Sequence, residues 1–131
     1  MYVRPRCDIS NHRRRTMTNI AKHHSVVTFI NNFTVDPENQ QRLIDLLVRV
    51  TENSVRHAHG FVSSSLHRSV DGRKVTMYAQ WRTIEDYEAM RRDPTPAPML
   101  REAMTFATFE PGVYEVVETF EPVRQSAGNP R

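Results

Sequence analysis

The strongest constraint on the fold is the segment LHRSVDGRKVTMYAQW, which runs from Leu66 to Trp81. It predicts two antiparallel strands around a two-residue Asp71-Gly72 turn, because Asp-Gly favours the positive backbone angles of a hairpin. Side chains alternate between the two faces of a strand, so Trp81 shares a face with Val75, Met77 and Ala79. The hairpin therefore predicts an antiparallel sheet with an apolar strip beside the only tryptophan.

The segments before the hairpin predict a strand followed by a helix. Residues 26–35 (VVTFINNFTV) are rich in β-branched and aromatic residues and alternate in polarity, which predicts a first strand. Its residues Asn31 and Phe33 share one face. Asp36 then provides an N-cap before proline, and apolar residues recur at helical spacing, so we expect a helix from Pro37 to His57.

The segments from the hairpin onward complete the pattern. Strands are expected over residues 61–70 and 73–82, and Thr83 with Asp86 forms a capping box that opens a short helix. A second short helix is expected over residues 99–108, then a Pro111-Gly112 turn and a last strand over 113–120. The order β-α-β-β-α-β is that of an α+β, ferredoxin-like fold, in which helices cover one face of an antiparallel sheet.

Composition and charge limit the compartment in which the protein is expected and the partners that it can bind. The chain has 131 residues, which suits one domain, and its single cysteine, Cys7, favours a reducing cytoplasm. No apolar run has the length of a membrane span. Residues 25–123 carry ten Lys/Arg and fourteen Asp/Glu, so the net positive charge lies in the termini. We therefore expect no membrane association, and nucleic-acid binding is disfavoured against a flexible basic leader over residues 1–24.

The face of the sheet that turns toward the helices predicts a ligand pocket. A mostly apolar cavity with a few polar groups suits a planar aromatic ligand. The candidates on the strands and short helices are Asn31, Phe33, Met77, Trp81, Tyr87, Arg101 and Met104. For Trp81, Tyr87 and Arg101 a purely structural role is an open alternative, and His67 is either a half-exposed strand residue or a proton carrier.

The opposite face of the sheet and the histidines suggest other interactions. Ile30 and Tyr78 would form a half-polar second face, which predicts pairing of two sheets in a homodimer. His57, His59 and His67 have no recognisable ligand spacing, so no metal site is expected. The chain also has no glycine-rich phosphate loop, so no nucleotide cofactor is expected.

Several segments resemble the antibiotic biosynthesis monooxygenase family of dimeric α+β barrels. The resemblance covers about residues 25–121 and leaves a flexible tail over 122–131. It is carried by VTFINNFTVDP, GFVSSSLHRSVDG, YAQWRTIEDYEAM and LREAM. It implies a monooxygenase that uses O2 without flavin, haem or metal to oxidise a phenolic or anthrone-type substrate to a quinone.

The resemblance also implies roles for particular residues. Trp81, Tyr87, Arg101 and His67 match pocket residues of quinone-forming members, and Asn31 matches a first-strand asparagine. Met77 departs from the family pattern, because those members usually carry asparagine four residues before the tryptophan. Asn31 and Arg101 would stabilise an oxyanion, Trp81 would hold the ring and O2, and Tyr87 or His67 would relay protons.

Three rival functions follow from the same residues. A non-catalytic ligand-binding or stress-responsive dimer would share the fold and the pocket, and Met77 is compatible with it. Related barrels degrade haem with a histidine on the second helix, but residues 84–92 contain none, so haem degradation is disfavoured. Nucleic-acid binding through the Arg-rich leader would depend strongly on salt.

Overall fold

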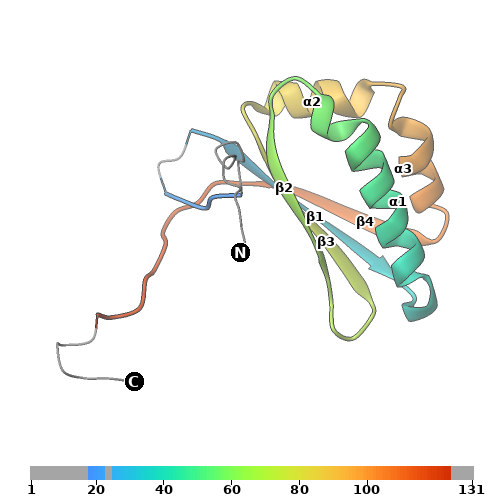
Figure 1. Ribbon diagram of the computed structural model, residues 1–131, viewed down its shortest axis with the longest axis horizontal. Coiled ribbons are helices and arrows are strands. Elements are labelled where there is room, and N and C mark those ends of the chain that lie inside the picture. The colour runs from blue at the N-terminus through green and yellow to red at the C-terminus, as the bar shows by residue number, and fades with distance from the viewer. Residues whose placement is uncertain (1–17, 23–24, 125–131) are drawn as a thin grey trace, which may run out of the picture.

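The computed structural model describes residues 18–22 and 25–124 and contains one four-stranded antiparallel sheet in the order β2-β3-β1-β4. Three α-helices cover one face of that sheet (Figure 1). The elements are β1 (Val27–Val35), α1 (Gln40–Asn53), β2 (Phe61–Arg68), β3 (Lys74–Trp81), α2 (Ile84–Arg92), α3 (Ala97–Ala103) and β4 (Ala107–Tyr114). The expected ferredoxin-like α+β fold is confirmed.

The predicted alternation of faces along the central strands is also confirmed. In the antiparallel pair of β1 and β3, Val27 lies opposite Trp81 and Asn31 lies opposite Met77. Buried side chains on the helix-facing side of the sheet form two clusters. One surrounds Trp81 and Phe29, and the other lies between α1 and the ends of the strands away from Trp81. The site therefore rests on the two strands at the centre of the sheet.

The segment predicted as one helix over 37–57 is divided into three pieces. A 3-10 turn spans Pro37–Asn39, α1 follows, and a second 3-10 turn spans Val55–His57. The break falls at Ser54, whose backbone leaves the helical region at φ −141°. One of the two hydrogen bonds of the capping box predicted for α2 is present, because the Thr83 Oγ1 accepts the Asp86 N–H at 3.0 Å.

The hairpin loop is wider than the predicted two-residue turn. Ser69 N–H donates to the Lys74 carbonyl at 3.0 Å, so four residues, 70–73, form the loop, and Gly72 takes a φ of +84°. Side chains stabilise this wider loop: Ser69 donates to the Asp71 carboxylate at 2.7 Å, and Asp71 accepts the Arg73 N–H. These two hydrogen bonds lower the pKa of Asp71.

The prediction for the last helix and strand was wrong in its bounds. The helix ends at Ala103 and β4 runs from Ala107 to Tyr114, through the Pro111-Gly112 pair that was expected to turn. Strand β4 is at the edge of the sheet and pairs only with β1. Proline is tolerated there because an edge strand leaves one side of its backbone unpaired. Residues 115–124 have no regular secondary structure and lead away from the sheet (Figure 1).

The described part of the N-terminal leader contacts the sheet. Thr18 donates to the Ser63 hydroxyl at 3.1 Å, and the Gln80 side chain donates to the Asn19 carbonyl at 2.8 Å. Lys22 forms an ion pair with Glu118 at 2.9 Å, and this hydrogen bond lowers the pKa of Glu118. The rest of the predicted leader, with Cys7, and residues 125–131 of the predicted tail lie outside the described residues.

The structure also bears on membrane insertion. Within residues 18–22 and 25–124, no helix combines the length and the apolar character needed to cross a bilayer.

Candidate active site

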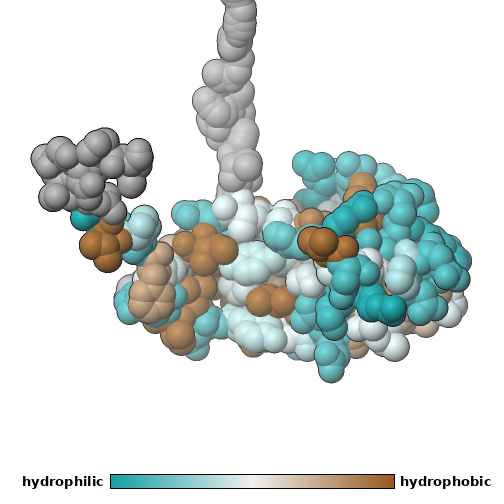
Figure 2. Space-filling view, turned by 90° about the horizontal axis from the view of Figure 1, so that it is seen from below, coloured by the Kyte–Doolittle hydropathy of each residue, from teal (hydrophilic) through white to brown (hydrophobic). Residues whose placement is uncertain are grey.

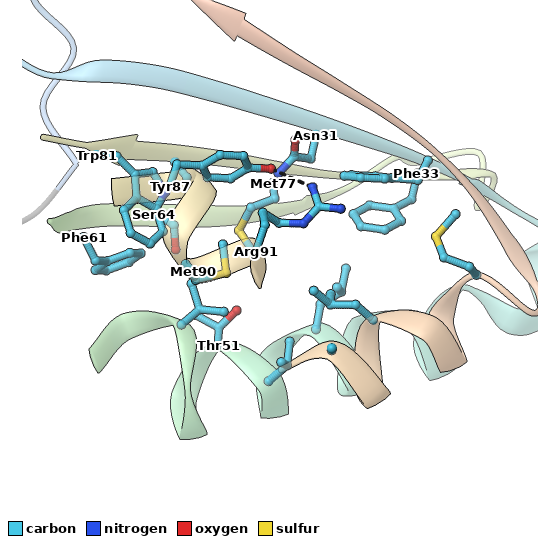
Figure 3. Close-up of a pocket in the computed structure, with 18 of the residues that line it drawn as sticks. Asn31, Phe33, Thr51, Phe61, Ser64, Met77, Trp81, Tyr87, Met90 and Arg91 are labelled. Atoms are coloured by element: carbon cyan, nitrogen blue, oxygen red, sulfur yellow. Dashed lines mark hydrogen bonds between the residues drawn. The ribbon is translucent and has the colours of Figure 1, made fainter. Parts of the chain in front are cut away.

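A cavity of about 390 Å³ lies between the helices and the sheet. Figure 3 shows side chains from the strands above it and from the helices below it. Seven of the residues predicted from the sequence line this cavity, namely Asn31, Phe33, Met77, Trp81, Tyr87, Arg101 and Met104. The strands and the short helices therefore bring the predicted residues together, although their catalytic roles stay predictions.

One end of the cavity has an aromatic wall of fixed geometry. Trp81 is only 1% exposed and makes edge-to-face contacts with Phe61 and Tyr87, at centroid distances of 5.4 and 5.7 Å. Tyr87 also stacks on Phe29 at 3.9 Å. Such aromatic contacts hold each ring on two sides. The wall can therefore accept a flat ring without large rearrangement of Trp81.

Asn31 is the polar residue of the sheet wall. It is half-buried on β1, and its Oδ1 is buried with no hydrogen-bond partner in the described part of the chain. A buried amide oxygen without a partner is unfavourable for folding by about 1–3 kcal/mol. Met77 lies directly opposite Asn31 on β3 and offers only a thioether. Asn31 thus retains hydrogen-bonding capacity that its protein neighbours do not use.

Arg91, which is not among the residues predicted from the sequence, also lines the cavity. Its Nη1 donates to the Tyr87 hydroxyl at 3.1 Å, which Figure 3 marks with a dashed line. Its Cζ lies 5.5 Å from the centre of the Phe109 ring. The i, i+4 spacing of Tyr87 and Arg91 on one helix face was a signal that could have identified the pair.

The structure does not bring His67 to the cavity. His67 lies opposite Thr76 in the pairing of β2 and β3, and so belongs to the face of the sheet turned away from the helices. It is exposed, and its Nε2 lies 2.9 Å from the Ser65 hydroxyl. The alternation of β2 accounts for this position, because its neighbour Leu66 shares the face of Met77.

Hydroxyl groups and cations complete the lining. Ser64 on β2 and Thr51 on α1 contribute hydroxyls that the sequence analysis did not select. Among the described residues that line the cavity, Arg91 and Arg101 are cationic and none is Asp or Glu. Within residues 18–22 and 25–124 no group of three His, Cys, Asp or Glu side chains could hold a metal ion. The polar groups of the cavity are therefore mainly hydrogen-bond donors, suited to an electron-rich oxygen.

The fold and the cavity together define a small-molecule-binding α+β domain of ferredoxin-like topology. The chain belongs to the antibiotic biosynthesis monooxygenase family, which matches residues 26–95. It is similar to a tetracenomycin-F1 monooxygenase of Streptomyces glaucescens, with 40% identity over 104 residues that cover 79% of this chain and 93% of that protein. The chain is accordingly a monooxygenase, an oxidoreductase.

Solved structures show the same fold at lower sequence identity. A monooxygenase from the gene ActVA-Orf6 of Streptomyces coelicolor, in complex with nanaomycin D, has a TM-score of 0.66 and 24% identity over 76% of this chain and 94% of that chain. SnoaB of Streptomyces nogalater, described as a cofactor-independent oxygenase, has in a mutant form a TM-score of 0.64 and 22% identity, covering 76% of this chain and all of SnoaB. Both similarities confirm the fold expected from the sequence.

Proposed function

We propose that the chain is a cofactor-independent monooxygenase that oxidises a phenolic or anthrone-type aromatic compound with O2 to a quinone. The observation that carries the proposal is a cavity whose lining combines an aromatic wall at Trp81, the amide of Asn31 and the cationic Arg101. The 40% identity to a tetracenomycin-F1 monooxygenase supports a polyketide-type aromatic substrate, and SnoaB supports chemistry without a cofactor.

The proposed reaction needs only the substrate's own electrons. An anthrone CH2 group loses a proton and becomes an electron-rich anion, which transfers one electron to O2. The substrate radical and superoxide combine to form a C–O bond, and protonation gives a hydroperoxide. Loss of water from this intermediate, with cleavage of the O–O bond and removal of the second C–H proton, leaves a carbonyl. One oxygen atom enters the quinone and the other leaves as water.

The residues of the cavity would act on the anion and on its protons. The Asn31 Nδ2 and the Arg101 guanidinium would donate hydrogen bonds to the oxyanion, because preorganised donors at such a charge lower the barrier most. Trp81, which is buried, would hold the ring and O2 at the aromatic end of the cavity. Tyr87 would relay protons, since it is the titratable hydroxyl in the cavity and His67 lies on the other face.

We also propose that the chain acts as a homodimer paired through the face of the sheet turned away from the helices, beside the part that Thr18 and Asn19 contact. Ile30 and Tyr78 are cross-strand partners on that face, and both are half-buried. Beyond β4, Val117, Phe120 and Val123 are 78–90% exposed. Figure 2 views the molecule from below relative to Figure 1. Hydrophobic side chains lie among polar ones on this side of the molecule and along the segment after β4. Pairing with a second copy would cover such side chains.

Oxygen uptake tests the proposed reaction. Metal-free protein is mixed with 1,8-dihydroxyanthrone, and O2 consumption and the quinone absorbance are followed together. We expect one O2 consumed per quinone formed, and a loss of about 100-fold in rate for Asn31→Ala and Arg101→Ala. Thr108→Ala, an exposed substitution on β4, is the control. Unchanged rates in Asn31→Ala, Arg101→Ala and Trp81→Phe would refute the assignment.

A ligand-binding protein without turnover is the alternative outcome. Such a protein would be stabilised against heat by aromatic ligands and would consume no O2 with any anthrone or dihydroxynaphthalene. The same titration therefore separates an enzyme from a binding dimer.

A further inference from the structure

The lining of the cavity carries more positive charge than the proposed oxidation requires. A single developing oxyanion needs one cation, yet the lining, as far as the structure describes the chain, carries both Arg91 and Arg101 and no acidic residue. The two arginines come from different helices, Arg91 from the last turn of α2 and Arg101 from α3. The second cation therefore needs a separate explanation.

The dipole of α2 does not explain the position of Arg91. Arg91 and Arg92 both lie in the last turn of that helix, where either cation would interact favourably with the helix C-terminus. Only Arg91 lines the cavity. The structure thus provides two adjacent arginines in the same helix turn, one directed to the site and one not.

The contacts of Arg91 leave most of its donors available. A guanidinium has five N–H donors and accepts no hydrogen bonds. One of them is used by the Tyr87 hydroxyl at 3.1 Å, and the Phe109 ring lies 5.5 Å from its Cζ. Within residues 18–22 and 25–124 Arg91 forms no salt bridge. Figure 3 shows its guanidinium between Tyr87 and Phe33.

We propose that Arg91 is a specificity-determining residue that binds a carboxylate substituent of the aromatic substrate. A planar guanidinium matches the two oxygens of a carboxylate, and the aromatic rings beside it restrict its orientation. The Tyr87 hydroxyl fixes one edge of the guanidinium and leaves the others for the substrate. The preferred substrate is then a carboxylated polycyclic aromatic compound, with its ring system toward Trp81. This inference rests on the proposed function only in taking the cavity as the substrate site.

The test uses two probes with the same ring system, 2-naphthoate and its neutral amide 2-naphthamide. Neither is a phenol or an anthrone, so binding is measured by isothermal titration calorimetry without turnover. We expect the wild type to bind the carboxylate about tenfold or more tightly than the amide. Arg91→Gln should abolish this preference, whereas Arg92→Gln should retain it. Thermal unfolding of both variants verifies that they are folded.

Three results would overturn the assignment. They are equal binding of both probes by the wild type, retention of the preference in Arg91→Gln, and loss of the preference only in Arg101→Gln. A preference for the carboxylate in a protein that consumes no O2 with anthrones would refute the proposed oxidation and leave the anion site standing.

Discussion

Asn31 and Met77 face each other across the central strands, so that a buried amide oxygen with no partner among the described residues lies opposite a thioether. In the sequence-based prediction, Asn31 matches a first-strand asparagine of quinone-forming members, whereas Met77 departs from their pattern. If the amide serves folding, its loss should destabilise the protein. If it serves a ligand, its loss should affect the reaction instead.

Asn31→Ala should separate activity from stability. Removal of the unpartnered oxygen relieves a cost of about 1–3 kcal/mol, which offsets the packing lost with the side chain, so the free energy of unfolding should not fall by more than about 1 kcal/mol. Oxidation of an anthrone should slow by about 100-fold, because a donor to the oxyanion is lost. The control is Asn32→Ala, since Asn32 accepts a hydrogen bond from Thr76 at 2.8 Å on the other face. Denaturant unfolding and O2 uptake measure both quantities; a slower reaction in Asn32→Ala alone would contradict the role of Asn31.

Met77→Asn should increase the rate of oxidation. Directly opposed residues on antiparallel strands have Cβ atoms about 4.5–5.5 Å apart, so a second amide would lie beside Asn31. One additional hydrogen bond to the oxyanion corresponds to about tenfold in kcat/KM. Met77→Leu keeps the apolar side chain and should stay within about twofold of the wild type. Equal kcat/KM values for the two variants would show that an asparagine at position 77 does not assist the reaction in this protein.

Tyr87→Phe should reduce kcat while the fold is kept. The ring stacked on Phe29 at 3.9 Å remains, and only the hydroxyl that accepts from Arg91 is lost. A neutral hydrogen bond contributes about 1 kcal/mol, so the melting temperature should fall by only a few degrees. Loss of a proton relay should lower kcat about 100-fold or more. A variant with wild-type kcat at saturating substrate would exclude Tyr87 from proton transfer.

His67→Ala should leave catalysis unchanged. His67 is exposed on the face of β2 away from the cavity, where its ring contacts the Ser65 hydroxyl. We expect kcat/KM within about twofold of the wild type, as for most exposed substitutions away from a site. Steady-state kinetics over pH 5–8 covers the range in which a histidine normally titrates. A drop of about tenfold confined to part of that range would contradict this expectation.

The sequence was informative about the sheet because a strand has a period of two. Counting from Trp81 placed Met77 on the face of the cavity, and the same alternation on β1 placed Asn31 on one face with Phe33. The register that sets Asn31 opposite Met77 comes from the structure. The same counting applied to β2 places His67 on the other face, but the resemblance to the family had suggested a role for it. Local periodicity was therefore the better guide to position.

The errors arose where tertiary contacts decide the structure. Pro111 and Gly112 form a turn in many sequences, but here they lie in an edge strand that pairs with β1. Arg91 was missed because its role depends on the hydroxyl of Tyr87 and on the Phe109 ring from β4. The i, i+4 spacing on α2 suggests the Tyr87 contact, but the Phe109 contact cannot be inferred without knowing how α2 lies on the sheet.

The face of the sheet turned away from the helices provides the last prediction, which concerns the proposed dimer. Ile30 lies on that face, between Tyr78 on β3 and Gly112 on β4. Ile30→Asp would bury a charge at the interface, which is strongly unfavourable for association without a partner cation. We expect the mass measured by analytical ultracentrifugation to fall from dimer to monomer. Val48→Asp, at a 40% exposed position on the helical side, should remain dimeric. A monomeric wild type, or a dimeric Ile30→Asp protein, would exclude pairing through this face.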